Sequence, residues 1–361
     1  MTRYVDEYRD AGLCAEISAK IKDISRKPFN IMEVCGGHTM SIRKNGIHKM
    51  VGNNIRLMSG PGCPVCVAAV SDVDKAAAVS LTDNTVLCTF GDMMRVPGSK
   101  MSLITARALG GDVRTVYSVQ DALKYAKAEP DKMFVFLAAG FETTAPTIAA
   151  AIIQAGSEDV RNFSVLSLLR TMPRALEAVL SGKPARIDAL LCPGHVTVVT
   201  GTEMYRTIVA KRGVSCCVSG FEPADILRAI YELTKMHEAS EPGLFNAYER
   251  VVEENGNLSA KRAIDEVFEP ASTSWRGLGV IPLSGLKIKE KYSDYDAEKR
   301  LDIKVQESAE KPGCICGDIL RGARVPEDCG LFGKTCTPED PMGACMVSSE
   351  GTCAAWYQYG K

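Results

Sequence analysis

The stretch MFVFLAAGFETTAPTIAAAIIQAG (133–156) decides the fold class of this 361-residue chain. Its first eight residues are almost entirely apolar, as in a strand that is buried on both faces. A short turn with polar residues follows, and the next residues repeat their apolar positions at helical spacing. A buried strand followed directly by a helix is the building unit of a parallel sheet with helices on both faces.

The same pattern recurs along most of the chain and predicts an α/β fold. Nine strands are many for one sheet, and GFET (140–143) and GFEP (220–223) each lie between a strand-like run and a helix-like segment. We therefore expect two Rossmann-like parallel-sheet domains that face a cleft. The nine apolar runs cover residues 29–35, 54–60, 85–90, 113–118, 133–140, 163–169, 187–194, 214–220 and 279–285.

Four segments are expected from changes in composition. The segment after residue 286 is charged and lacks a strong apolar face, and the cysteine-rich tail behind it has few apolar residues for a core. A metal cluster would hold such a tail together. The expected segments are an N-terminal helical arm (1–27), a first α/β domain (28–140), a second α/β domain (141–285), and a linker with a small iron–sulfur domain (286–361).

Composition excludes several classes of protein. With 43 Lys and Arg against 44 Asp and Glu, the net charge is −1, which argues against a nucleic-acid binder that relies on positive charge. No apolar run approaches the ~18 residues of a membrane span. The N-terminus is charged and has no apolar signal core. We expect a cytoplasmic protein that binds neither nucleic acid nor membranes.

Cysteine is concentrated in the tail, where six of the fourteen cysteines fall between Cys314 and Cys353. In a cytoplasmic chain such a cluster indicates metal binding or redox chemistry rather than a disulfide scaffold. The spacing matches neither a zinc ribbon nor the ferredoxin run. Four thiolates would hold a [4Fe–4S] cluster and leave a pair that can form a disulfide. Structural zinc and an unmetallated disulfide tail stay open as alternatives.

A C-x-x-C motif, Cys63 to Cys66, follows a strand-like run and opens a helix-like segment. Amide groups at the start of a helix stabilise a thiolate, so the pKa of one of these cysteines is expected to fall. Both redox exchange and soft-metal binding fit the motif. Half of a zinc site is the alternative, although no second C-x-x-C lies nearby.

Further polar residues follow other strand-like runs. Cys35 and His38 of EVCGGHT (33–39) end the first run, and ligands bind beyond the carboxyl ends of strands in doubly wound folds. Asp92, Glu142 and His195 follow three other runs. Each of these alone fits a helix cap or a turn. Together they predict one cleft on which the motifs converge.

Taken together, these motifs resemble the HypD family of [NiFe]-hydrogenase maturation factors over essentially the whole chain. The resemblance is more specific than any single spacing. The matching stretches are EVCGGHT (33–39), SGPGCPVC (59–66), TFGDMMRVPGS (89–99), AGFETTAPT (139–147), CPGHVTVVTG (192–201) and the tail from Cys314 to Tyr357.

The resemblance implies a scaffold and redox centre for assembly of the Fe(CN)2CO group of the hydrogenase, with a resident [4Fe–4S] cluster. It implies work with a HypC-type chaperone and cyanide delivery from HypE, with HypF upstream. The finished iron unit would then pass to the hydrogenase large subunit. Such a scaffold is not an enzyme in the strict sense if each copy is consumed in one assembly.

The resemblance also implies roles for individual residues. Cys35 would be the iron ligand, and Cys63 and Cys66 the redox pair. His38, Asp92 or Glu142 would handle protons or orient cyanide, without a separate role for each. By analogy with ferredoxin–thioredoxin reductase, we expect Cys316, Cys329, Cys336 and Cys345 as cluster ligands, with Cys314 and Cys353 as a redox pair.

Two rival functions stay open. A general iron–sulfur thiol–disulfide reductase needs only the C-x-x-C pair, whereas a scaffold needs Cys35 as a third soft ligand beside it. An interaction protein stapled by structural zinc would need none of this redox chemistry.

Overall fold

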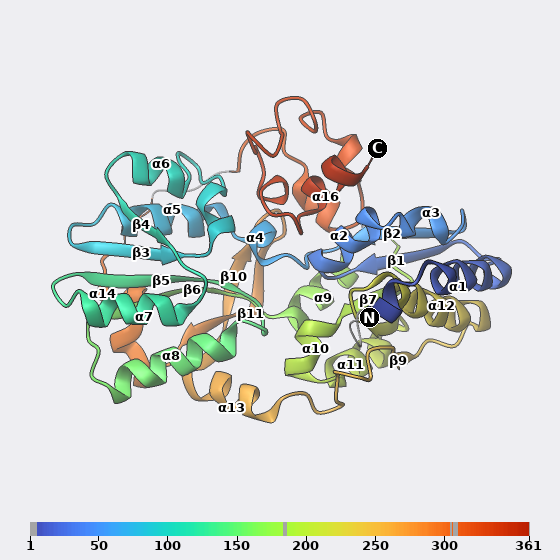
Figure 1. The fold of residues 1–361 in the computed structure, drawn as a ribbon, viewed down its shortest axis with the longest axis horizontal. Coiled ribbons are helices and arrows are strands. Elements are labelled where there is room, and N and C mark those ends of the chain that lie inside the picture. The colour runs from blue at the N-terminus through green and yellow to red at the C-terminus, as the bar shows by residue number, and fades with distance from the viewer. Residues whose placement is uncertain (1–5, 183–185, 304, 306–309, 361) are drawn as a thin grey trace.

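A computed structural model describes residues 6–360 except 183–185, 304 and 306–309. It contains two parallel sheets, an antiparallel hairpin and a cysteine-rich tail (Figure 1). The first five residues of the expected N-terminal arm lie outside the described part. The α/β class with parallel sheets, expected from the sequence, is confirmed.

The first sheet has the strand order β2-β1-β7-β8-β9, and the second has the order β4-β3-β5-β6. Strands β1 to β8 coincide with the first eight apolar runs of the sequence. The strands of the first sheet are β1 (Phe29–Glu33), β2 (Ile55–Ser59), β7 (Ala189–Pro193), β8 (Ser215–Ser219) and β9 (Leu244–Asn246). Those of the second are β3 (Thr85–Thr89), β4 (Asp112–Thr115), β5 (Met133–Gly140) and β6 (Phe163–Leu169).

The ninth apolar run departs from the predicted pattern. It lies in β11 (Gly279–Ile288), which pairs antiparallel with β10 (Phe268–Trp275). The sequence carries little sign of β10, because its residues between Phe268 and Trp275 are small, polar or charged, include Pro270, and are all partly or fully exposed. This hairpin lies between the two sheets in Figure 1.

The sheets do not divide at residue 140, the expected boundary between two α/β domains. Strand β1 pairs with β7 in the first sheet, and β5 pairs with β6 in the second. Each expected domain therefore contributes strands to both sheets. All strands of the second sheet come from one continuous segment of the chain (85–169). Strands β7, β8 and β9, which follow it in sequence, then complete the first sheet.

Helices cover both faces of each sheet. One apolar core joins the inward faces of the two sheets through residues such as Leu137 and Leu190, and two further cores lie on the outer faces. The longer helices are α1 (Ala11–Ile24), α2 (Gly36–Lys44), α5 (Val70–Ser80), α7 (Val119–Ala128), α8 (Ala145–Ser157), α9 (Met172–Ser181), α11 (Glu203–Arg212), α12 (Pro223–Ala239), α13 (Leu258–Val267) and α16 (Thr352–Tyr359).

Short helices connect these elements. The α-helical ones are α3 (Ile47–Met50), α4 (Pro64–Val67), α6 (Leu103–Ala108), α10 (Gly194–Thr200), α14 (Ala297–Arg300) and α15 (Cys316–Leu320). The 3-10 turns are η1 (Asp6–Arg9), η2 (Gly91–Arg95), η3 (Glu290–Tyr295), η4 (Pro326–Asp328) and η5 (Ala344–Met346).

Candidate functional site

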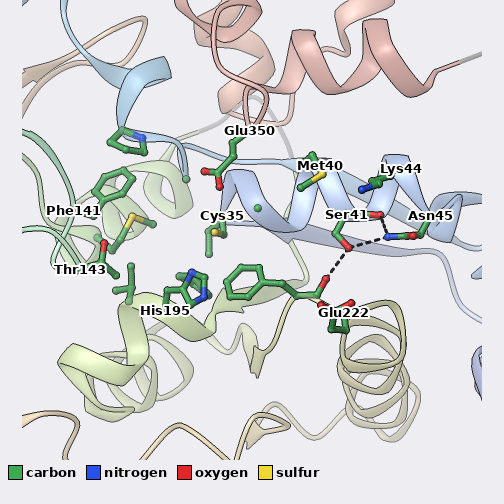
Figure 2. Close-up of a pocket in the computed structure, with 18 of the residues that line it drawn as sticks. Cys35, Met40, Ser41, Lys44, Asn45, Phe141, Thr143, His195, Glu222 and Glu350 are labelled. Carbon is green, nitrogen blue, oxygen red and sulfur yellow. Dashed lines mark hydrogen bonds between the residues drawn. The ribbon is translucent and has the colours of Figure 1, made fainter. Parts of the chain in front are cut away.

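A cavity of about 680 Å³ opens at the carboxyl edge of the first sheet. The strand order of this sheet reverses between β1 and β7, and residues at the ends of both strands, Cys35 and Pro193, line the cavity. Ligands of open α/β sheets bind at such a reversal. We call this space the first cavity; its wall also includes Phe141, His195 and Glu350 (Figure 2).

Cys35 lies where β1 gives way to α2, and Figure 2 places its side chain between Glu350 and His195. Burial, the carboxyl of Glu350 and the sulfur of Cys63 raise the pKa of Cys35 to about 12. Without a positive charge beside it this cysteine stays a thiol, and a bound metal cation would be needed to hold the thiolate.

The C-x-x-C loop packs directly against Cys35. Gly36 N–H donates to Gly62 O at 3.1 Å. A Cβ at Gly62 would come within 2.3 Å of the backbone nitrogen of Cys35, so only glycine allows this approach. A Cβ at Gly36 would likewise come within 3.1 Å of Cys63 Cβ, so Gly36 and Gly62 together allow the two cysteine loops to pack.

Cys63 and Cys66 form a close pair at the start of α4. The Cys66 thiol donates to Cys63 Sγ at 2.7 Å, and Cys66 N–H donates to the same sulfur at 3.3 Å. Burial raises the pKa of Cys66 well above its usual value, with further contributions from Cys345 and Cys63. The fall in cysteine pKa that the motif predicts does not apply to Cys66, because burial outweighs the helix dipole.

His38 does not line the first cavity. Its ring is fully buried, its Nε2 lies 2.9 Å from Gly220 O, and it stacks on Phe221. Burial lowers the pKa of His38 to about 4, so the ring is neutral near pH 7. His195 stacks on the same Phe221 and does line the cavity. The sequence singled out His195 only as a weaker candidate, although it follows a strand end.

Glu142 lies behind the wall of the first cavity, next to Phe141. One carboxyl oxygen accepts the Met172 N–H at 2.8 Å, and the other has no hydrogen-bond partner among the described residues. Burial raises the pKa of Glu142 to about 7. The carboxyl can therefore hold or release a proton near neutral pH.

A second cavity, of about 360 Å³, contains Asp92, so the polar strand ends do not all meet in one cleft. Asp92 accepts a hydrogen bond from Ser348 at 2.8 Å, which joins η2 to the tail. Glu350 lines both cavities. No sequence pattern marks Glu350 as a site residue, since it lies more than 300 residues away from Cys35.

All six tail cysteines line one further cavity, which we call the cysteine cavity. Apolar side chains such as Ile319 and Leu331 complete its wall. In the described residues no group of three or more His, Cys, Asp or Glu is arranged to hold a single metal ion. Six thiols around one apolar space instead fit the donor set of an iron–sulfur cluster, which needs four thiolates spread around it.

The cysteine cavity touches the C-x-x-C pair through Cys345. Hydrogen bonds from Cys316 and Cys66 to Cys345 lower the pKa of Cys345. Cys316 in turn contacts Cys314. The structure thus joins Cys63, Cys66, Cys345, Cys316 and Cys314 in one row of sulfur contacts, from the sheets into the tail.

No helix in the described part of the chain is long and apolar enough to cross a membrane.

Comparison with known proteins gives consistent matches over nearly the full length. The HypD sequence family, described as "Hydrogenase formation hypA family", matches residues 12–360. The hydrogenase maturation factor HypD of Cupriavidus necator is 42% identical, covering 99% of this chain and 97% of its own length. That of Escherichia coli is also 42% identical, covering 99% and 98%. A putative hydrogenase expression/formation protein of Methanocaldococcus jannaschii is 44% identical, covering 97% and 98%.

Proposed function

This chain belongs to the HypD family of hydrogenase maturation factors, and on that premise we propose that it is the scaffold on which the Fe(CN)2CO group is assembled. The iron unit is its cargo, with Cys35 as the protein ligand. A HypC-type chaperone shares the cargo, HypE supplies cyanide with HypF upstream, and the hydrogenase large subunit receives the product.

The contact between three thiol sites carries this proposal. Cys35 lies in the first cavity, the Cys63–Cys66 pair packs against it, and Cys345 joins that pair to the tail. A soft, low-spin iron with cyanide and CO ligands suits a thiolate ligand. The cation would also supply the positive charge that stabilises the Cys35 thiolate in the first cavity.

The contacts favour a division of the six tail cysteines that differs from the one expected from the sequence. Cys316 and Cys345 are 2% and 1% exposed and contact each other, and Cys345 also contacts Cys66. The remaining four influence one another: Cys314 and Cys329 both affect Cys336, and Cys314, Cys329 and Cys336 affect Cys353. We therefore assign Cys316 and Cys345 as the redox pair, with Cys314, Cys329, Cys336 and Cys353 as cluster ligands.

In this arrangement a bound [4Fe–4S] cluster supplies electrons one at a time. The Cys316–Cys345 and Cys63–Cys66 dithiols each hold two electrons as sulfur–hydrogen bonds. Because Cys345 contacts both Cys316 and Cys66, thiol–disulfide exchange can pass an electron pair from one dithiol to the other. Buried surroundings keep water away from this path.

The remaining predicted residues have supporting roles in the proposal. Neutral His38 holds the loop at Gly220 and, through Phe221, the position of His195. Glu142 is a proton store beside the cavity, since its carboxyl is protonated over part of the neutral range. Asp92 joins η2 to the tail at Ser348.

A general thiol–disulfide reductase is the second candidate. The position of Cys63 on an open cavity favours it, because a reactive thiol must meet its substrate. A reductase of this kind has no use for Cys35 in the neighbouring cavity.

Infrared spectroscopy tests the proposal. The protein is co-expressed with its maturation partners and purified without oxygen. The scaffold predicts CO and cyanide stretching bands in the window where protein groups do not absorb, and Cys35→Ala removes them. Cys14→Ala, at a buried cysteine of α1 that lines neither cavity, is the matched control and keeps them. Absence of the bands from the partner-bound wild type would leave the reductase as the better function.

A further inference from the structure

One corner of the β10–β11 hairpin lies against the helix of the C-x-x-C motif. We call residues 275–277 the hairpin corner. Trp275 pairs with Ala68 in an isolated antiparallel bridge, and the Arg276 N–H donates to Val67 O at 2.9 Å. Val67 is the last residue of α4 and Ala68 is its C-cap, and the hairpin lies beside this short helix in Figure 1. The hairpin corner is therefore fixed to the end of α4.

The hairpin corner also packs against the tail. Gly277 has a φ of +70°, and a Cβ there would lie 2.5 Å from the Cα of Gly317. A Cβ at Gly317 would lie 2.4 Å from Gly277 O. Only glycine fits at either position, because these distances are too short for an added carbon atom. The Cβ at Gly277 would also lie 3.6 Å from the sulfur of Cys316, so the hairpin corner borders the cysteine cavity.

Arg276 places a buried positive charge in this corner. It is 5% exposed, and its guanidinium donates to Ala68 O at 2.7 Å and to Pro97 O at 2.9 Å. Among the described residues no carboxylate forms an ion pair with Arg276, whereas the buried Arg170 pairs with Asp72. Burying an unpaired charge is costly, and arginine keeps its proton in proteins. The hairpin corner therefore holds a permanent cation that a nearby anion would stabilise.

The charge of Arg276 acts on the thiols of the tail. Contact with Cys316 and burial raise the pKa of Cys314, and the Arg276 charge opposes this rise. A carboxylate also lies at the corner, since Glu310 accepts the Gly277 N–H at 2.7 Å. Glu310 is exposed, so water and salt screen its charge, whereas the buried charge of Arg276 is screened much less. The positive charge therefore dominates at this border of the cysteine cavity.

The cysteine cavity by itself disfavours a reduced iron–sulfur cluster. A cluster with four thiolate ligands is an anion, and reduction adds a further negative charge to it. Apolar side chains such as Ile319 and Leu331 line the cavity and do not stabilise that charge. A buried cation at the border does stabilise it, because Coulomb interactions are strong where water is excluded.

We propose that Arg276 is the countercharge of the tail cluster and raises its reduction potential. This inference rests on the proposed function, in which the tail holds a [4Fe–4S] cluster. One electron enters from a low-potential one-electron donor, and no bond forms or breaks. No proton accompanies the electron, because the positive charge of Arg276 is already in place. Since Arg276 is hydrogen-bonded to the end of α4, this charge stays at the contact between that helix and the tail.

Potentiometric titration of the purified, cluster-loaded protein tests the role of Arg276. Dye mediators set the potential, and the electron paramagnetic resonance signal of the reduced cluster measures its fraction. At the potential where the wild-type cluster is half reduced, Arg276→Gln should lower the ratio of reduced to oxidised cluster by about tenfold, which equals about 59 mV for one electron. Arg276→Lys keeps the charge and should stay within about twofold of the wild-type ratio.

Two exposed charges provide matched controls. Arg324→Gln removes an exposed cation of the tail and should leave the ratio unchanged, because solvent screens that charge. Glu310→Gln removes the carboxylate at the hairpin corner but keeps an oxygen that can accept the Gly277 N–H. It should raise the ratio by about twofold, since a negative charge near the cluster is lost. These variants separate the buried charge of Arg276 from the net charge of the tail.

A wild-type ratio in cluster-loaded Arg276→Gln would overturn the proposal. If that variant binds no cluster, Arg276→Lys decides. A loaded cluster at the wild-type ratio, together with the rise in Glu310→Gln, supports the role of the charge. A fall of about tenfold in Arg276→Lys, which retains the charge, contradicts it.

The infrared bands of the iron cargo keep this test separate from that of the proposed function. Bands that persist while Arg276→Gln titrates like the wild type would reject the role of Arg276 and keep the scaffold. A lowered ratio in Arg276→Gln, in a protein that shows no bands with its partners, would reject the scaffold and keep the role of Arg276.

Discussion

The two parallel sheets and the cysteine-rich tail hold their shapes by different means. In the second sheet, Phe134, Phe136 and Phe163 are fully buried among helices, while the chemistry sits in loops beyond the strand ends. The tail has only a small apolar cluster of its own, around Met346 and Ala354, and six cysteines surround one cavity. In the sheets, apolar side chains stabilise the fold and loop residues carry the chemistry. In the tail, we expect the same thiols to do both.

The largest effect is expected from removing a cluster ligand. Cys314→Ser should abolish the iron and acid-labile sulfide of the tail, and should destabilise the tail by on the order of 5 kcal/mol or more, because metal binding supplies most of its folding free energy. Iron and sulfide analysis and the fluorescence of Trp356 measure the two effects, in a Trp275→Phe background that leaves Trp356 as the remaining tryptophan.

Cys316→Ser is the control variant for Cys314→Ser, because it also removes one tail thiol. It should keep the cluster and block electron transfer to Cys63–Cys66, because Cys316 belongs to the inner pair in our assignment. A Cys316→Ser protein without cluster, beside a Cys314→Ser protein that keeps it, would restore the ligand set expected from the sequence.

The strands were predictable and their arrangement was not. Eight apolar runs became β1 to β8 because buried parallel strands are nearly continuous apolar segments. The pairing of β1 with β7 joins residues more than 150 positions apart, and no local pattern marks it. The ninth apolar run is part of β11, but its antiparallel pairing with β10 was not expected, since β10 carries mixed polar residues and is mostly partly or fully exposed.

For the candidate site too, local motifs could be read from the sequence but long-range contacts could not. The sequence singles out Cys35, Cys63 and Cys66 because each lies in a glycine-containing loop after a strand, and the structure brings these loops together. Cysteine spacing in the tail, however, does not say which thiols turn toward the sheets. Cys345 contacts Cys66 only because the tail folds back over α4, a long-range contact without a sequence signal.

Shortening a core side chain of the second sheet should destabilise the sheets and leave the tail unaffected. Phe136→Ala is expected to lower the free energy of unfolding of the sheets by about 3–5 kcal/mol, because it leaves a cavity in a fully buried site. Urea unfolding followed by Trp275, in a Trp356→Phe background, measures this loss. Iron content of the tail should stay at the wild-type level under native conditions. Loss of iron at the same urea concentration as the Trp275 transition would show that tail and sheets unfold as one unit.

The buried carboxyl of Glu142 should give the sheets a pH dependence. Its folded-state pKa of about 7 lies above the ordinary value of 4.5, so the folded protein holds a proton that the unfolded chain loses. Stability from this group is therefore complete below pH 4.5 and decreases as the pH rises toward 7. Glu142→Gln mimics the protonated form and should be more stable than the wild type at pH 8 by up to about 3 kcal/mol.

Urea unfolding at pH 5 and pH 8, followed by Trp275, checks this expectation. The two proteins should be nearly equal at pH 5 and diverge at pH 8. A constant difference at both pH values would show that Glu142 titrates at its ordinary value and does not act as a proton store.

The smallest expected effect concerns the contact that joins the two regions. The Arg43 guanidinium lies 3.4 Å from the centre of the Trp356 ring, which links α2 of the first sheet to α16 of the tail. Arg43→Lys keeps the charge and loses the flat stacking surface, so the tail should lose about 1 kcal/mol. The Trp356 urea midpoint measures this change, with Lys49→Ala on the exposed side of α3 as control. An unchanged Trp356 midpoint would mean that the cysteine contacts alone hold the tail on the sheets. A shift in the Trp275 transition as well would mean that the tail and the first sheet stabilise each other through this contact.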